Sequence, residues 1–219
     1  MSTKTIFLSF DDTLFNTNDL TSKIWTESLK KQYKVSISKK FFKENFCHFS
    51  NTTIANKINA QYGIDIDDEF IRIHINNVFN ELFSSYAMLV EDSIICLESL
   101  TKGKFKIIAY TKLFPYQIQF AMTNNRINKY INKVMHVGSG GLNPNIITQF
   151  CKDNRIDLNN CTLVSQSLND IAYARLINME CIGYTENYYT ETQNKDMMKN
   201  AKKTLIALSV LRFVISLKV

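Results

Sequence analysis

The stretch Ile6-Phe-Leu-Ser-Phe-Asp-Asp-Thr-Leu-Phe-Asn-Thr17 is the most informative part of the chain. It opens with the apolar run Ile6–Phe10, which has the length of a buried β-strand. Two carboxylates, Asp11 and Asp12, follow directly. In open α/β sheets ligands bind beyond the carboxyl ends of the strands, so polar residues at this point are candidates for a functional site.

Further short apolar runs occur later in the chain, and helical patterns lie between them. The runs predict strands at Lys106–Tyr110, Val134–Val137, Thr162–Val164 and Cys181–Tyr184. The segments between them predict helices at Pro115–Asn124, Asn145–Asn154 and Asn169–Asn178. Strands and helices in alternation are typical of an α/β domain with a doubly wound parallel sheet.

One segment interrupts this alternation. Between residues 18 and 86 the apolar spacing is helical throughout and predicts four helices, at Leu20–Tyr33, Lys39–Phe46, Thr52–Tyr62 and Asp68–Phe83. The acidic run Asp65–Glu69 supplies a capping start for the last of them. We therefore expect residues 1–17 and 87–219 to form the α/β core, and residues 18–86 to form an all-helical insert.

Composition limits the class of protein. The chain has 219 residues, a formal net charge of +6 and five cysteines without a CxxC pair. An odd number of cysteines favours reduced thiols, and Met1–Lys4 leads straight into the first strand, so we expect a cytoplasmic protein without a signal peptide. The apolar segment 204–219 contains Arg212 and is too short to cross a bilayer of about 30 Å. It predicts a docked helix over Leu205–Leu217.

The first stretch resembles the opening motif of the haloacid dehalogenase superfamily, in which an apolar strand ends in Asp-x-Asp-Gly-Thr-Leu. Asp11, Thr13 and Leu14 match that motif. Asp12 stands in place of the glycine, and Ser9 stands in place of the aspartate that is the family's nucleophile. The helical insert resembles the cap of the subgroup that contains phosphoglycolate phosphatases.

The other strand ends extend the resemblance. Thr111 matches the family's phosphate-binding Thr or Ser. In Gly140-Gly-Leu-Asn-Pro144, Asn143 occupies the position of the family's lysine. The stretch Leu163-Val-Ser-Gln-Ser-Leu-Asn-Asp-Ile-Ala-Tyr-Ala174 is similar to the fourth motif. There Gln166 replaces the principal metal-binding aspartate, whereas Asp170 is kept and has a helix cap as its alternative role.

The resemblance implies a phosphatase in which an aspartate attacks phosphorus and also ligates Mg²⁺. Three positions on which that chemistry depends are changed here, at Ser9, Asn143 and Gln166. The remaining carboxylates, without the lysine and the metal, predict a site charge of about −3, which disfavours phosphate. We therefore predict a degenerate catalytic site and no bound metal or cofactor, with a vestigial Mg²⁺ site at Ser9, Asp11, Gln166 and Asp170.

Three functional hypotheses remain open. The first is a pseudophosphatase that acts through protein binding, assembly or regulation. The second is a divergent phosphatase for a small phosphorylated metabolite, which would need Mg²⁺ and would use Asp11 or Ser9 as nucleophile. The third is a basic subunit of a ribonucleoprotein assembly, for which only the positive net charge speaks. Generic phosphomonoester hydrolysis separates the first two hypotheses, and salt dependence tests the third.

Overall fold

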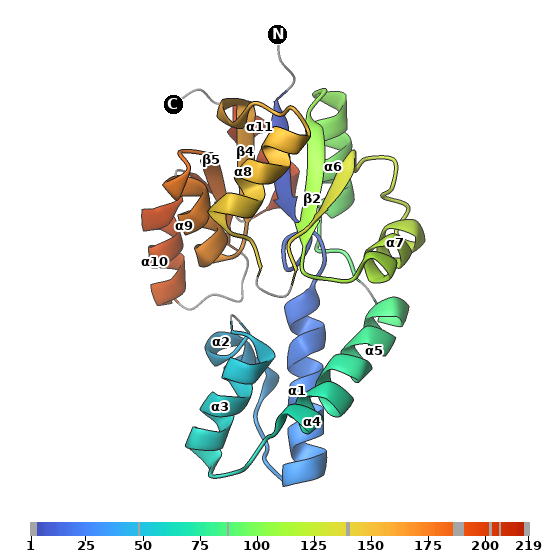
Figure 1. The fold of residues 1–219 in the computed structure, drawn as a ribbon, viewed down its shortest axis with the longest axis vertical. Helices are drawn as coiled ribbons and strands as arrows, with labels where there is room; N and C mark the ends of the chain where they lie inside the picture. Colours follow the sequence, from blue (N-terminus) through green and yellow to red (C-terminus); the bar gives the residue numbers. More distant parts are fainter. Residues whose placement is uncertain are drawn as a thin grey trace. The chain divides into compact units, whose positions relative to one another are not determined.

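The computed structural model describes residues 4–47, 49–86, 88–138, 141–185, 191–201, 203–205 and 207–216 (Figure 1). The chain divides into two compact units. The core unit comprises Met1–Phe15 and Met88–Val219, and the helical unit comprises Asn16–Ala87.

The core unit contains a six-stranded sheet in the order β3-β2-β1-β4-β5-β6, and every pairing in it is parallel. The strands are β1 (Thr5–Ser9), β2 (Lys106–Thr111), β3 (Lys133–His136), β4 (Cys161–Ser165), β5 (Glu180–Tyr184) and β6 (Lys203–Leu205). All residues of β1 and β4 are buried, as expected for central strands covered on both faces. The predicted doubly wound α/β fold is confirmed.

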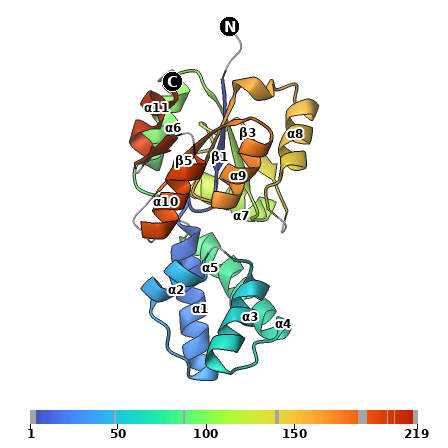
Figure 2. The same cartoon turned by 90° about the vertical axis from the view of Figure 1, so that its left-hand side faces the viewer.

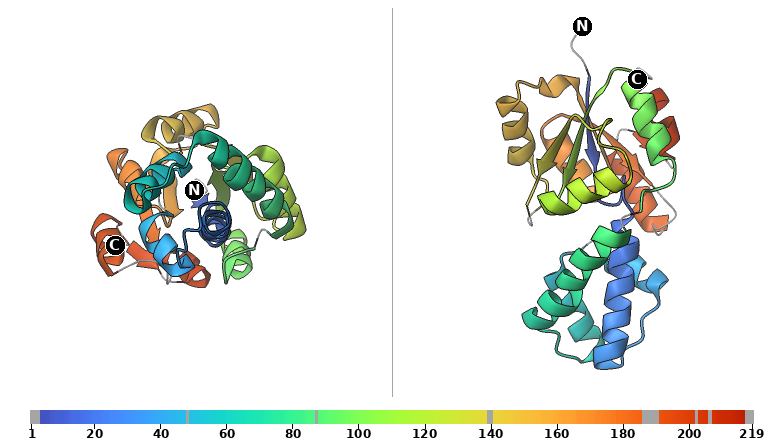
Figure 3. Two further views of the ribbon diagram at one scale, coloured as in Figure 1. Left: turned by 90° about the horizontal axis from the view of Figure 1, so that it is seen from below. Right: turned by 90° about the vertical axis from the view of Figure 1, so that its right-hand side faces the viewer.

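Helices cover both faces of this sheet, as Figure 3 shows. They are α6 (Ser93–Lys102), α7 (Pro115–Asn124), α8 (Pro144–Asp153), η2 (Leu158–Asn160, a 3₁₀ turn), α9 (Leu168–Leu176) and α10 (Glu191–Asn200). On one face, α8, α9 and α10 pack on the strands through a cluster that includes Phe7, Ile108, Ile147, Ile171 and Met197. Burying these apolar side chains is the main force that holds the sheet and helices together.

The C-terminal segment differs from the single helix predicted over Leu205–Leu217. Lys203–Leu205 pairs with β5 as strand β6. A 3₁₀ turn, η3 (Leu208–Val210), and a short helix, α11 (Leu211–Ser216), follow and pack on α6. The free edge of β5 offers backbone hydrogen bonds that a helix beginning at Leu205 would leave unused. The segment is nevertheless docked, and Leu217 lies outside the described residues.

Burial explains why this segment docks. Leu208 and Leu211 are fully buried, and the Ser209 hydroxyl donates a hydrogen bond of 2.7 Å to Asp92 at the start of α6. This hydrogen bond joins residues 117 positions apart in the chain. The tail therefore completes the core on the face that carries α6.

The described residues of the helical unit form helices and the loops between them (Figure 2). The helices are α1 (Thr17–Tyr33), α2 (Lys39–Asn45), α3 (Asn51–Tyr62), α4 (Asp68–Phe70), η1 (Ile71–Asn77, a π-helix) and α5 (Val78–Tyr86). Trp25, Phe42 and Ile58 are fully buried at its centre. Asp67 caps α4 by accepting the Phe70 N–H at 2.7 Å, because the first N–H groups of a helix lack partners within it.

The sequence also predicts reduced cysteines and no membrane-spanning segment. All five cysteines are reduced thiols, as expected, and Cys96, Cys151, Cys161 and Cys181 are buried. Among the described residues, no helix is both long and apolar enough to cross a membrane.

Candidate functional site

The carboxyl ends of β2, β1 and β4 lie side by side at the centre of the sheet. The connections leave β1 toward β2 but leave β4 toward β5, so the strand order reverses between β1 and β4. Ligands bind at such reversal points in open α/β sheets. We call the polar residues gathered here the strand-end cluster: Ser9, Asp11, Tyr110, Thr111, Lys112, Ser165 and Asp170.

A tight turn follows β1 and fixes the first members of the cluster. The Phe15 N–H donates to the Phe10 carbonyl at 2.9 Å, and the Asp12 N–H donates to the Phe15 carbonyl at 2.8 Å. Asp12 has a φ of +58°, in the left-handed region that favours glycine. This backbone explains why the similar family motif has glycine there, and aspartate is among the residues that tolerate it best.

Ser9, the last residue of β1, is only 5% exposed. Its hydroxyl donates a hydrogen bond of 2.9 Å to the backbone carbonyl of Asp11. The serine at the nucleophile position therefore directs its proton at an amide oxygen, which cannot accept a proton as a base does.

The Asp11 carboxylate is held by the end of β2. The Thr111 hydroxyl lies 3.1 and 3.2 Å from its two oxygens, and the Lys112 backbone N–H donates to Oδ2 at 3.1 Å. Thr111 in turn accepts the Leu113 N–H at 3.0 Å. Asp11 and Thr111, both predicted site residues, are thus in direct contact.

Asp170 lies on the other side of the cluster. Its Oδ2 accepts hydrogen bonds from the Tyr110 phenol at 2.8 Å and from the Ser165 hydroxyl at 2.9 Å. Ser167, not Asp170, caps helix α9, since its hydroxyl accepts the Asp170 N–H at 3.3 Å. The carboxylate of Asp170 therefore does not cap the helix but belongs to the cluster.

Gln166 and Asn143 have roles in local structure. Gln166 is 3% exposed, and its backbone N–H donates to the hydroxyl of the buried Thr13 at 3.2 Å, which joins the β1 turn to the end of β4. Asn143 caps helix α8, because its Oδ1 accepts the Ile146 N–H at 3.0 Å. Its side-chain oxygen is thus used as an acceptor within its own helix. Gly140 lies outside the described residues.

The two carboxylates of the cluster hold their protons more tightly than usual. Burial raises the pKa of Asp11 to about 6, although the hydrogen bonds from Lys112 and Thr111 and the charge of Lys112 oppose the rise. Burial also raises the pKa of Asp170, against the hydrogen bonds from Tyr110 and Ser165. The pKa of Tyr110 is raised by burial and by the charge of Asp170. Perturbed groups of this kind gather at functional sites.

Lys112 and Tyr110 are members of the cluster that the sequence motifs did not single out. The charge of Lys112 lowers the pKa of both Asp11 and Asp170. Its side chain runs along Gly141, where a Cβ would lie 2.8 Å from the Lys112 Cε. The predicted site charge of about −3 counts Asp11, Asp12 and Asp170, whereas the strand-end cluster contains Asp11, Asp170 and Lys112, whose formal charges add up to −1. A lysine directly after a strand-end threonine was the signal that could have found it.

The cluster does not suit a magnesium ion. Mg²⁺ requires near-octahedral oxygen ligands, with carboxylates prominent among them. Within the described part of the chain, no group of three or more His, Cys, Asp or Glu side chains could hold a metal. Of the four residues at the vestigial Mg²⁺ site, only Asp11 and Asp170 carry carboxylates, and both already accept hydrogen bonds.

A family model described as haloacid dehalogenase-like hydrolase matches residues 6–184, which span β1 to β5 and the helical unit. The chain belongs to the haloacid dehalogenase-like hydrolase family. The match includes every member of the strand-end cluster, so the cluster occupies the part of the chain that defines the family. No curated protein matches the sequence significantly.

Solved structures of haloacid dehalogenase-like proteins share the fold over nearly the whole chain. A haloacid dehalogenase-like protein of unknown function from Agrobacterium tumefaciens has a TM-score of 0.84 at 14% identity, with 98% of each chain covered. A family hydrolase from Deinococcus radiodurans, with bound phosphate and sodium, has a TM-score of 0.79 at 12% identity, covering 98% of this chain and 95% of that one.

A predicted phosphoglycolate phosphatase from Haemophilus somnus also has a TM-score of 0.79, at 14% identity and with 98% of each chain covered. At such identities the similarity establishes the fold, and function has to be argued from the site.

Proposed function

We propose that this chain is a haloacid dehalogenase-like protein without the family's Mg²⁺-dependent aspartyl-phosphate chemistry, and that it acts through protein binding, assembly or regulation. The observation that carries the proposal is the hydrogen bond from Ser9 to the Asp11 carbonyl. A serine attacks phosphorus only when a base removes its proton, and a carbonyl oxygen is not such a base.

The surroundings of Ser9 support the same proposal. Asn143 caps a helix, and Gln166 brings no carboxylate to the position where the family resemblance places the principal metal ligand. Nucleophile, cation and metal ligand are thus all replaced at the positions that align with the family motifs. A neighbouring residue can compensate for one such change. Three changes together remove the nucleophile, the positive charge and the metal ligand on which the family's reaction depends.

A divergent phosphatase is the second candidate, and two observations favour it. The family model describes hydrolases and covers all of the cluster. Asp11 has a pKa of about 6, so it is largely ionised at neutral pH, and it lies beside the Thr111 hydroxyl and the Lys112 charge. In this candidate Asp11 replaces the missing aspartate as nucleophile toward a small phosphorylated metabolite, and Lys112 replaces the missing lysine.

Hydrolysis of a panel of small phosphomonoesters with added Mg²⁺ separates the two candidates. We expect the purified chain to give no turnover above that of an Asp11→Ala variant. Asp153→Ala, which removes an exposed carboxylate on α8, is the matched control for a change of charge far from the cluster. Turnover that Asp11→Ala abolishes and Asp153→Ala preserves, in folded proteins, would establish the divergent phosphatase.

The binding role has its own test. Affinity purification from the native source should recover a protein that stays bound at raised salt. Recovery of nucleic acid with steep salt dependence would favour the ribonucleoprotein hypothesis instead, because phosphate contacts release counterions.

A further inference from the structure

Tyr110 is the member of the strand-end cluster that neither the family motifs nor the proposed function explains. It is the fifth residue of β2 and pairs with Ser9 of β1 in the parallel register. Paired residues of neighbouring strands project from the same face of a sheet. The Tyr110 side chain therefore stands next to that of Ser9, on the face that carries Phe7 and Ile108.

The phenol of Tyr110 lies among residues that align with the family's metal ligands. Its oxygen is 2.8 Å from Oδ2 of Asp170, and Tyr110 is the direct register partner of Ser9 on the neighbouring strand. Ser9 and Asp170 both belong to the vestigial Mg²⁺ site predicted from the resemblance. The Tyr110 side chain thus lies beside two of the four residues of the vestigial Mg²⁺ site.

Size makes the phenol and a metal ion mutually exclusive. A Mg²⁺ ion bound by side chains at positions 9 and 170 would lie about 2.1 Å from their oxygens and would need further oxygens around it. The Tyr110 oxygen occupies the space next to Oδ2 of Asp170, where the ion would have to bind. The aromatic ring that carries this oxygen is buried, and only 3% of the Tyr110 surface is exposed. Tightly packed interiors do not let a ring of this size move aside without cost.

Hydrogen bonding makes the replacement stable. Asp170 accepts the phenol and the Ser165 hydroxyl on the same oxygen, and Ser165 accepts the Ser167 N–H at 3.0 Å. Buried polar groups are costly unless they are paired, and these bonds pair the carboxylate without a cation. Tyr110 and Ser165 therefore supply the hydrogen bonds that the Asp170 carboxylate needs when no metal ion is bound.

We propose that Tyr110 closes the divalent-metal position of this fold, so that restoring the missing carboxylates alone would not restore Mg²⁺ binding. The inference rests on the proposed loss of Mg²⁺ chemistry but goes beyond it, because it assigns Tyr110 a blocking role. It makes Tyr110, and not only the changed motif residues, a determinant of metal exclusion.

The test restores the carboxylates with and without the phenol. Ser9→Asp/Gln166→Asp is prepared with Tyr110 intact, with Tyr110→Val and with Tyr110→Phe, and Mg²⁺ binding is measured by calorimetry. We expect Tyr110→Val to bind Mg²⁺ at least about tenfold more tightly than the protein with Tyr110 intact, which corresponds to about 1.4 kcal/mol. Valine suits a strand and removes the ring.

Tyr110→Phe keeps the ring and removes only the oxygen, so it decides the question if the valine variant does not fold. We expect it to bind Mg²⁺ more tightly than the protein with Tyr110 intact. Tyr130→Phe in the same background is the matched control, because Tyr130 donates to Glu98 at 2.7 Å elsewhere in the core unit. Circular dichroism checks that each variant is folded.

Equal Mg²⁺ affinity with and without Tyr110 would overturn the blocking role. That result leaves the proposed function standing, because the proposed function fails on a different observation, phosphomonoester hydrolysis by the unchanged chain.

Discussion

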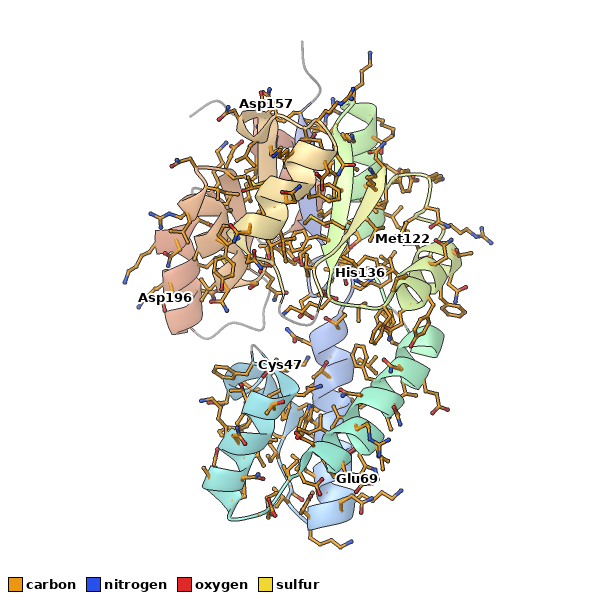
Figure 4. All side chains as sticks on the ribbon, in the orientation of Figure 1. Cys47, Glu69, Met122, His136, Asp157 and Asp196 are labelled. Atoms are coloured by element: carbon orange, nitrogen blue, oxygen red, sulfur yellow. The ribbon has the colours of Figure 1, made fainter. Side chains whose placement is uncertain are left out.

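The carboxylates at the two ends of the sheet in the core unit have different hydrogen-bond donors. At the amino end, Glu180 accepts hydrogen bonds from Lys4 and Thr162, each at 2.8 Å, and Lys203 lies 3.9 Å away. At the carboxyl end, Asp11 and Asp170 are held by hydroxyl and backbone donors. Figure 4 labels Asp157 near the first end and His136 near the second.

The pKa of Glu180 is shifted in the opposite direction to the pKa values of Asp11 and Asp170. Burial works against the ionisation of Glu180, but the hydrogen bonds and charges of its neighbours, Lys4 first, hold its pKa below the ordinary value. The pKa values of Asp11 and Asp170 are raised, because burial outweighs their neutral donors and the charge of Lys112. Glu180 has cationic partners, whereas the donors to Asp11 and Asp170 are neutral, and this difference decides whether burial raises the pKa of the carboxylate.

The largest effect should come from Asp11→Asn. Because the folded pKa of Asp11 is about 6, against about 3.9 when unfolded, its protonated form stabilises the fold below about pH 4. That stability is lost as pH rises through 6. The variant should therefore be more stable than the natural chain at pH 8 by about 1–2 kcal/mol, since its amide cannot ionise.

Urea unfolding between pH 4 and pH 8 measures this effect, with Asp153→Asn as the exposed control. The control should follow the natural chain at every pH. An Asp11→Asn protein that is less stable than the natural chain at pH 8 would show that the Asp11 carboxylate is favourable as an ion, and the contrast between the two ends would disappear.

A smaller effect of opposite sign should follow Lys4→Met. Glu180 has a lowered pKa, so its stabilising contribution is present above the unfolded value of about 4.3 and is lost as pH falls through the folded pKa. Removing Lys4 should cost about 0.5–1 kcal/mol at pH 7, since the pair is partly exposed, and nothing near pH 2. The same urea series measures it, and a loss that persisted at pH 2 would count against the ionic explanation.

The smallest effect should come from Lys112→Met. The charge of Lys112 lowers the pKa of Asp11 and Asp170, so both pKa values should rise further when it is removed. Because the lysine is exposed, stability at pH 7 should change by less than about 0.5 kcal/mol. Carbon-13 NMR of the aspartate carboxyl groups measures the titrations, with Lys152→Met as control. Unchanged titrations would mean that Lys112 does not act on the site.

Sequence patterns predicted much of this fold for definite reasons. The apolar runs predict β1, β2, β4 and β5 correctly, because parallel strands that are buried on both faces are apolar along their whole length. Strand β6 was missed, because three residues at an edge carry little pattern and its Leu205 continues into an apolar tail. The predicted helix over that tail was wrong at its start, where pairing with β5 prevails over helical spacing.

For the site, sequence placed polar residues at the right strand ends but could not assign their contacts. The motifs predict both Thr111 and Asp11 as site residues, and the structure shows a hydrogen bond between them although they are 100 positions apart in the chain. Neither Tyr110 nor Lys112 stands at a motif position, so the motifs do not predict a role for either residue. The predicted degenerate site and the absence of a metal stay predictions until hydrolysis and binding are measured.

The sequence by itself determined the α/β class, the order of the strand-end motifs and the exchange of carboxylate for hydroxyl at Ser9, since these depend only on residue type and spacing. The tertiary structure alone decided which donors meet each carboxylate. The Tyr110–Asp170 bond joins residues 60 positions apart. Such a contact depends on the order and register of the strands, which fix the positions of side chains that are distant in the chain. No local sequence pattern encodes the order in which strands pair.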